Sequence, residues 1–360
     1  MSFYIMCMYS TIASIHIFPP RPEVIIQICN IYIYSHILYI MEFEQYKTNR
    51  TTEITAKYAT KKTALVAKYN RLMYTVAVSR LILDIPRELA RLKSLYTTEL
   101  NTTNRAMDAE ITNIKMPAPI DCIKSPKKAL LVGINYIGSP DELNGCINDV
   151  ENIAANLVGF KSIVKLTDNT ATKPTWYGIL SELKKMLVTS VAGDCLLFTF
   201  SGHGSQTADR NGDETDMYDE CLYTFDNKYI KDDELNALIR AYLKPNVTFF
   251  AILDSCHSGT ALDLKYQYLD YSENPKNIEP AGNMIMISGC RDDQYSADAY
   301  INSKSQGAMT WAFLKNLQPQ ITWRQLVTNM VTSLAESEYT QIPKLTSGKF
   351  VDLDSKFLFA

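Results

Sequence analysis

The fold is decided by the stretch Phe249-Phe250-Ala251-Ile252-Leu253-Asp254-Ser255-Cys256-His257-Ser258-Gly259. An apolar run that begins at Val247 has the length and the aromatic and β-branched content of a buried strand. The run ends at Asp254, and small polar residues with a glycine follow it. A thiol just after such a strand lies where open α/β sheets bind and process ligands. The stretch therefore predicts an α/β protein with Cys256 at its functional site.

A second stretch has the same construction, namely Leu196-Leu197-Phe198-Thr199-Phe200-Ser201-Gly202-His203-Gly204. Here an apolar run ends in a histidine between two glycines. His203 and Cys256 can meet only if both strands belong to one sheet. A thiolate is a strong nucleophile, and a nearby imidazole can take the thiol proton and pass it to a leaving amine. The alternative is a buried structural cysteine and a hydrogen-bonded histidine, but two polar strand ends favour a catalytic pair.

Composition excludes several classes of protein. The 360 residues are 46% hydrophobic and 21% charged, which is typical of a soluble globular protein. A net charge of −3 gives no reason to expect nucleic-acid binding. The eight cysteines form no CxxC pair, which favours reduced thiols and a cytoplasmic compartment over a disulfide framework or a zinc module.

The first 120 residues differ from the rest of the chain. Residues 1–40 are apolar and allow three interpretations: a signal sequence, a membrane span diluted by polar residues, or a segment outside a working protein that starts at Met41. We favour the third, and expect no membrane attachment. Residues 41–120 are predicted to form a helical extension, with helical spacing over 51–83 and 87–100 and a linker over 101–120.

From residue 127 to residue 355 strands alternate with helices. The predicted strands, beside the two quoted above, are Ala129–Ile134, Val164–Leu166 and Met284–Ile287. The predicted helices are Asn148–Leu157, Thr175–Val188, Asp232–Leu243, Gln306–Leu317 and Thr322–Leu334. This alternation predicts a mainly parallel central sheet with helices on both faces, preceded by a mostly helical N-terminal extension.

Several motifs in this region resemble those of metacaspases. They include Leu131-Val132-Gly133-Ile134-Asn135-Tyr136, Leu143-Asn144-Gly145-Cys146-Ile147-Asn148-Asp149-Val150, the two strand ends at His203 and Cys256, Ile287–Asp298 and Gly307–Phe313. The resemblance covers roughly 127–350, with a large-subunit-like part over 127–265, a short linker over 266–281 and a small-subunit-like part over 282–355. The short linker resembles the type I branch.

The resemblance implies the caspase–hemoglobinase fold and a cysteine endopeptidase. Cys256 would be the nucleophile and His203 the general base and acid. The backbone N–H groups of Gly204 and Cys256 would hold the oxyanion, often the largest single catalytic contribution. No organic cofactor is implied.

Substrate specificity can be argued from two carboxylates. Asp254 lies two residues before Cys256 and so shares its side of the strand end. Asp149 begins a helix, where it could instead serve as a cap, and Asp254 could instead accept bonds from nearby backbone. In metacaspases the matching positions line the pocket for the residue before the scissile bond, here Cys146, Asp149, Ser201 and Asp254. Two carboxylates favour a cation, so we expect cleavage after Arg or Lys and not after Asp.

The acidic segment Asp209–Asp219 and the pair Asp232-Asp233 raise the question of a metal. The spacing is not that of an EF-hand. In calcium-activated metacaspases the ligand positions match Asp219, Asp232, Asp233 and Asp263, an oxygen set that suits Ca²⁺ as an activator. A shorter Phe225–Ile230 segment departs from the family pattern. The alternative is a solvated acidic loop.

The partners expected are peptide and protein substrates, and the enzyme is expected to act as a monomer, as metacaspases generally do. Self-processing is common in the family, and its candidate sites are Lys161, Lys165, Lys173 and the run from Lys265 to Lys276. A catalytically silent scaffold that recruits partners through its helical extension is the alternative function.

Overall fold

The computed structural model describes residues 22–78, 84–117, 120, 122, 125–208, 218–255, 262–269, 272–274, 276–289, 298–301 and 304–357. The chain divides into two compact units, Met1–Met116 and Pro117–Ala360. Among the helical residues that are described, no stretch combines the length and the apolarity needed to cross a bilayer.

The first unit is a helical hairpin. Helix α2 spans Pro22–Val78 and continues across Met41, and helix α3 spans Ile85–Thr112 with Asp84 as its N-cap. The two helices are tied together by Lys57 on Glu110 (2.7 Å) and by Lys68 on Glu99 (2.9 Å). The prediction of a linker was wrong for residues 101–112. Three threonines there bond their hydroxyls to carbonyls four residues earlier, so they are accommodated within the helix.

The second unit is built on an eight-stranded sheet with the order β2-β1-β3-β7-β10-β13-β8-β9. The first five strands in this order are parallel, and β13 and β8 add antiparallel pairs. The strands are β1 (Lys127–Gly133), β2 (Phe160–Thr167), β3 (Cys195–Ser201), β7 (Thr248–Asp254), β8 (Tyr266–Gln267), β9 (Ser272–Glu273), β10 (Asn283–Ser288) and β13 (Lys344–Ser347).

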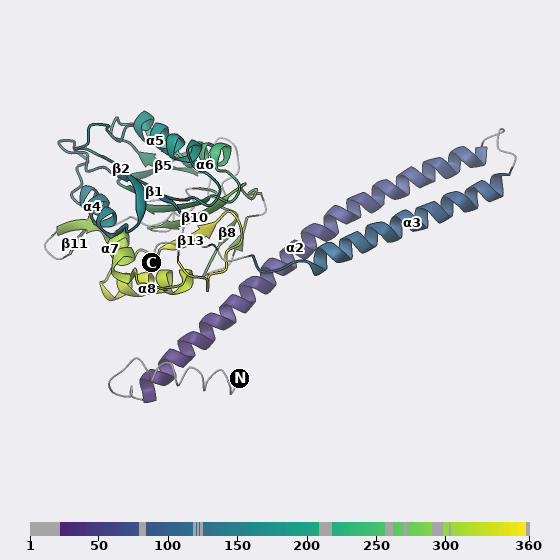
Figure 1. Ribbon diagram of the computed structural model, residues 1–360, viewed down its shortest axis with the longest axis horizontal. Helices are drawn as coiled ribbons and strands as arrows, with labels where there is room; N and C mark the ends of the chain where they lie inside the picture. The colour runs from purple at the N-terminus through teal and green to yellow at the C-terminus, as the bar shows by residue number, and fades with distance from the viewer. Residues whose placement is uncertain are drawn as a thin grey trace. The chain divides into compact units, whose positions relative to one another are not determined.

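Helices cover both faces of this sheet, as the alternation predicted. On one face lie α5 (Trp176–Val188) and α6 (Asp232–Tyr242), and on the other lie α4 (Cys146–Asn156), α7 (Ala308–Asn316) and α8 (Trp323–Glu336), as Figure 1 shows. Successive residues of β7 serve opposite faces: Phe249 stacks on Phe198, whereas Phe250 packs edge-on against Trp323. Both rings are fully buried. Because helices cover the sheet on both sides, β7 is apolar from Phe249 to Leu253.

Two smaller sheets were not predicted. One has the order β4-β5-β6, from β4 (Gly204–Ala208), β5 (Tyr218–Tyr223) and β6 (Tyr229–Lys231), and it begins directly after His203. The other pairs β11 (Asp298–Ile301) with β12 (Lys304–Gly307) just before α7. Both lie in polar stretches without a clear period-two pattern, which is why the sequence suggested loops.

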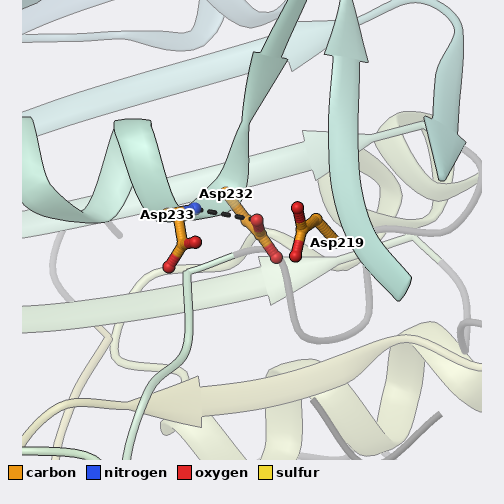
Figure 2. Close-up of side chains that lie close together, drawn as sticks. All are labelled: Asp219, Asp232 and Asp233. Atoms are coloured by element: carbon orange, nitrogen blue, oxygen red, sulfur yellow. Dashed lines mark hydrogen bonds between the residues drawn. The ribbon is translucent and has the colours of Figure 1, made fainter. Parts of the chain in front are cut away.

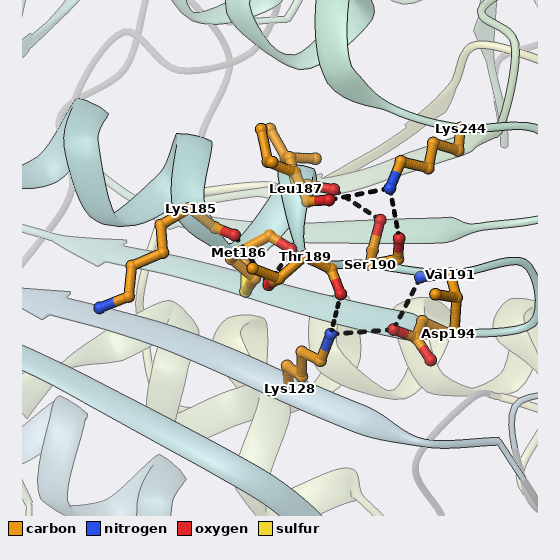
Figure 3. Close-up of polar contacts among 10 residues, drawn as sticks. Lys128, Lys185, Met186, Leu187, Thr189, Ser190, Val191, Asp194 and Lys244 are labelled. Carbon is orange, nitrogen blue, oxygen red and sulfur yellow. Dashed lines mark hydrogen bonds and ion pairs between the residues drawn. The ribbon is translucent and has the colours of Figure 1, made fainter.

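Two lysines bind the end of α5 at the edge of the sheet where its strands begin (Figure 3). Lys128 donates to the carbonyl of Thr189 at 2.9 Å and forms an ion pair with Asp194 at 3.0 Å. Lys244 donates to the carbonyls of Val188 and Ser190. These contacts satisfy carbonyls that have no partner within the helix. The ion pair also joins Lys128 of β1 to Asp194, the residue before β3.

The expectation that all thiols are reduced was wrong for one pair. Cys122, before β1, and Cys195, the first residue of β3, form a disulfide. No CxxC spacing signals this bond because its two cysteines are 73 positions apart. Cys221 is a free, buried thiol, and Cys146 is also buried.

Candidate active site

His203 follows β3 and is held by both its backbone and its ring. Its backbone N–H donates to the hydroxyl of Tyr136 at 3.0 Å, and its carbonyl accepts from the N–H of Tyr223 at 3.0 Å. Its ring Nε2 lies 2.8 Å from the carbonyl oxygen of Asp141. Because a carbonyl can only accept, Nε2 carries the hydrogen in this contact. That leaves Nδ1 of a neutral imidazole as the atom that can act as a base.

Tyr136 is the residue that fixes this arrangement, and sequence reasoning noted it only as part of a motif. Its hydroxyl accepts from His203 and donates to the carbonyl of Tyr223 at 2.8 Å. Its ring centroid lies 4.9 Å from that of the imidazole. Burial raises the pKa of Tyr136, so its hydroxyl keeps the proton that it donates. The glycine before the histidine is the sequence feature that could have pointed to this contact. A Cβ at Gly202 would lie 2.9 Å from the hydroxyl of Tyr136, so only glycine fits there.

The register of β3 and β7 agrees with the predicted dyad. The two strands pair in parallel with Ser201 opposite Asp254. Two residues further along each segment of the sequence are His203 and Cys256. Cys256 lies outside the described residues, so its role as nucleophile stays a prediction.

Gly204 begins β4, where it lies opposite Leu222 of β5. The preceding pair, His203 and Tyr223, is joined by a backbone hydrogen bond. Opposed residues in an antiparallel ladder alternate between bonded and non-bonded pairs, so the N–H of Gly204 points away from β5. This orientation is compatible with the predicted oxyanion donor, which stays a prediction.

Two buried carboxylates converge on the N-terminus of α7. Asp149 is fully buried and accepts from Ser201 Oγ at 2.6 Å and from the N–H of Gly307 at 3.0 Å. Asp254 is 4% exposed and accepts from the N–H of Thr310 at 2.9 Å and from its hydroxyl at 2.8 Å. A helix N-terminus stabilises anions, which explains how two carboxylates can be buried side by side.

The structure thus brings together three of the four residues predicted for the pocket, Asp149, Ser201 and Asp254, and their role in substrate binding stays a prediction. Cys146, at the start of α4, is 4% exposed and lies in the same helix as Asp149. Asp149 does not cap its own helix, because the N-cap of α4 is Gly145 without a side-chain bond. The alternative interpretation of Asp254 holds in part, since backbone of the distant α7 donates to it. Sequence reasoning gave no role to Gly307, where a Cβ would collide with the carboxylate of Asp254.

Three of the four predicted calcium ligands lie together. Asp219 of β5 and Asp232 and Asp233 of α6 place carboxylate oxygens within 4.8 Å of one another (Figure 2). Burial raises the pKa of Asp232 to about 6, against hydrogen bonds from Glu220 and from the N–H of Asp233. Lys231 forms an ion pair with Asp219. The donor set is all carboxylate oxygen, which fits Ca²⁺ better than a soft metal.

The structure does not place Asp263 in this group of carboxylates. It follows residues outside the described part of the chain, has a left-handed φ of 45°, and interacts electrostatically with Arg240 of α6. Its role as a calcium ligand therefore stays a prediction.

Cys221 is not a competing nucleophile. It is 2% exposed on β5, and burial raises the pKa of its thiol to about 11. A thiol with so high a pKa carries almost no thiolate at neutral pH.

A histidine and a cysteine that follow adjacent parallel strands of a helix-covered sheet define a class: the Cys–His hydrolases of the α/β type. Comparisons with known proteins identify the family. The model of the metacaspase peptidase C14 domain matches residues 127–265. Metacaspase-1 of Scheffersomyces stipitis is 35% identical over 295 residues, which cover 64% of this chain and 73% of the relative. Metacaspase-1 of Meyerozyma guilliermondii is 34% identical over 310 residues, or 68% of this chain and 75% of that protein.

The chain belongs to the metacaspase family of cysteine peptidases. A crystal structure of a Geobacter sulfurreducens protein shares the fold with a TM-score of 0.50, at 24% identity over 65% of this chain and 97% of that one. The predictions of the family and of the caspase–hemoglobinase fold are thereby confirmed.

Proposed function

We propose that this protein is an endopeptidase that cleaves after Arg or Lys with Cys256 as nucleophile and His203 as general base and acid. The observation that carries the proposal is the placement of His203, with Nε2 on the carbonyl of Asp141 and with β3 in register with the strand that leads to Cys256. Nδ1 would take the thiol proton as sulfur attacks the carbonyl carbon. The same proton would pass to the amine when the C–N bond breaks.

The preference for a basic residue rests on the carboxylates of Asp149 and Asp254. Two negative charges that lie against one glycine favour a nearby cation, and the planar guanidinium of Arg can meet both. Ser201 supports the pocket because its hydroxyl bonds Asp149 at 2.6 Å. A substrate with Asp before the scissile bond would add a third negative charge, which disfavours it.

The test is turnover of peptide reporters that end in Arg, Lys or Asp. Wild type should cleave the first two and Cys256→Ala should cleave none. Asp254→Asn should lower kcat/KM on the Arg reporter roughly 100-fold, as the loss of one partner of a buried charge pair does. Asp108→Asn is the control because it makes the same change at an exposed carboxylate of α3, away from these residues in the sequence and in the other compact unit. Faster turnover of the Asp reporter than of the Arg and Lys reporters would refute the proposal. Turnover of none of the three reporters would also refute it and would favour the alternative function, a scaffold without catalytic activity.

Calcium stimulation is proposed on the carboxylates of Asp219, Asp232 and Asp233. A bound calcium ion would neutralise these charges and hold β5 against the first turn of α6. β5 also carries Tyr223, whose N–H bonds the carbonyl of His203 at 3.0 Å. Ordering of this strand would therefore act on the backbone of the catalytic histidine. Chelation should lower activity, and added calcium should restore it; equal activity in both conditions would contradict the site.

Self-processing is proposed at Lys276. It is exposed in the segment that joins the two parts of the catalytic unit, whereas Lys265 is buried and forms an ion pair with Glu273 at 3.2 Å. A scissile residue must leave the surface to enter the pocket, which favours an exposed lysine. Mass spectrometry should find a new terminus after Lys276 that is absent from Cys256→Ala.

A further inference from the structure

A row of three tyrosines starts at the catalytic histidine. The ring of Tyr136 lies 4.9 Å from the imidazole of His203, the ring of Tyr223 lies 5.5 Å from that of Tyr136, and the ring of Tyr229 lies 5.2 Å from that of Tyr223. Tyr223 and Tyr229 lie opposite each other in the ladder between β5 and β6. We call Tyr136, Tyr223 and Tyr229 the tyrosine row.

The topology of the sheet gives the row a direction. Tyr136 follows β1, and β1 and β7 lie on opposite sides of β3. The row therefore leaves His203 on the side away from β7, the strand that leads to Cys256. A molecule that extends from the imidazole along the row moves away from the nucleophile.

The row also passes from the interior to the surface. Tyr136 is 4% exposed, Tyr223 is half-buried, and Tyr229 is 46% exposed. The hydroxyl of Tyr223 reaches the surface, where it donates to Asn227 at 2.8 Å. Two more apolar side chains, Ile137 after β1 and Phe225 after β5, are exposed in the segments that carry the row. Tyrosine side chains, which combine an apolar ring with a hydroxyl that can contact water, are enriched in protein interfaces.

The chemistry of peptide cleavage indicates which part of the substrate would lie along the tyrosine row. Sulfur forms a bond with the acyl carbon, the C–N bond breaks, and the imidazolium gives its proton to the amine. The acyl part stays on Cys256, so the segment that begins with the new amine must leave on the side of His203. We propose that the outer two rings of the tyrosine row, those of Tyr223 and Tyr229, bind this leaving-group segment and prefer apolar or aromatic side chains in it. The inference rests on the proposed endopeptidase function.

The dimensions of a peptide agree with this assignment. An extended chain advances about 3.3 Å per residue, so Tyr229 is within reach of roughly the first five residues after the scissile bond. A reporter whose leaving group is a single small dye does not reach the outer rings. The two kinds of substrate therefore separate binding by the row from support of His203.

The experiment compares two substrates that share one acyl segment ending in Arg. One releases aminomethylcoumarin, and the other is an internally quenched peptide with Leu and Phe at the second to fourth positions after the cleavage site. In Tyr229→Ala the KM of the long peptide should rise about three- to tenfold, the range expected for loss of one aromatic contact. The KM and kcat of the coumarin substrate should stay unchanged. Replacing Leu and Phe of the peptide by Ser should abolish the difference between wild type and variant.

The control is Tyr242→Ala, which removes a tyrosine at the C-terminal end of α6, and it should change neither substrate. Tyr229→Thr is a second variant that keeps a strand-forming residue in β6 if the alanine variant does not fold. An unchanged KM for the long peptide in the folded variant would overturn the inference. Equal losses on both substrates would overturn it too, because the row would then act only through His203. If wild type cleaves neither substrate, the proposed endopeptidase function is refuted, and the inference is refuted with it.

Discussion

At the scale of single residues, the hydroxyl of Tyr136 is one of the groups that hold His203 in place. Tyr136 bonds two backbone groups with it, the N–H of His203 and the carbonyl of Tyr223. Tyr136 follows the last residue of β1 by three positions with a left-handed φ of 52°, and its ring centroid lies 4.9 Å from that of the imidazole. A hydroxyl so placed does not touch the substrate, so Tyr136 is a positioning residue.

Tyr136→Phe keeps the ring and removes only those two hydrogen bonds. We expect kcat to fall about tenfold, which corresponds to roughly 1.4 kcal/mol, with little change in KM. The pH profile should also shift if the imidazole moves relative to the carbonyl of Asp141. Tyr223→Phe is the matched control, because its hydroxyl bonds only Asn227 among the contacts described. An equal fall in kcat in both variants would contradict the positioning role of the Tyr136 hydroxyl.

At the scale of elements, the turn from β6 into α6 carries both the acidic group and a basic residue. Lys231 ends β6, pairs with Asp219, and directly precedes Asp232 and Asp233. Its ammonium partly neutralises the site that calcium is proposed to fill. Calcium must therefore compete with a cation that belongs to the chain.

Lys231→Met should tighten calcium binding about tenfold, because one charge no longer opposes the ion. The calcium-free variant should melt at a lower temperature than wild type, since three nearby carboxylates lose a counter-charge, and calcium should raise its Tm by more. Isothermal titration calorimetry and thermal unfolding measure both effects without the use of activity. Lys228→Met, which removes an exposed lysine paired with Asp226, is the control. An unchanged Kd in Lys231→Met would contradict the competition.

At the edge of the sheet where the strands begin, the contacts of Lys128 at the end of α5 allow a test of how burial affects the stabilisation by an ion pair. Asp194 is 2% exposed and loses its ammonium partner in Lys128→Met. This variant should lower the free energy of unfolding by about 1–3 kcal/mol, because a buried carboxylate is left without its charge partner. Lys185→Met breaks an exposed pair with Glu182 on the same helix and should cost no more than about 0.5 kcal/mol. Chemical denaturation compares the two, and equal costs would show that burial does not decide the effect.

At the scale of the whole molecule, the disulfide between Cys122 and Cys195 ties the segment before β1 to the start of β3, the strand that precedes His203. It closes a loop of 73 positions, which restricts the unfolded chain. The oxidised full-length protein should show the disulfide-linked peptide pair of Cys122 and Cys195 by non-reducing mass spectrometry. Reduction should lower its stability by about 4 kcal/mol on the chain-entropy account. Cys122→Ser should melt like the reduced wild type and should not respond to reductant; a wild type insensitive to reductant would contradict this role.

The hairpin shows how far sequence patterns reach along the chain. Helical spacing predicted α2 from Thr51 onward and the first part of α3. It did not predict that α2 begins at Pro22, and the polar residues after Leu100 suggested a linker where the helix in fact continues to Thr112. The two helices are matched by Lys57 with Glu110 and Lys68 with Glu99, which advance by eleven residues in opposite directions. Such pairs between helices are set by packing and leave no signal within either helix.

The sequence by itself determined the α/β class, the metacaspase family and the two strands that end before His203 and Cys256. These depend on local properties: an apolar run long enough for a buried strand, and the small polar residues that stop it. Only the tertiary structure decided that Gly307 and Thr310 bind the pocket carboxylates, that Tyr136 holds His203 and that Lys231 pairs with Asp219. Gly307 lies 158 positions from Asp149, and the packing of α7 against α4 brings them together. Contacts of this kind arise from the burial of whole helix faces, so no short stretch of the sequence specifies them.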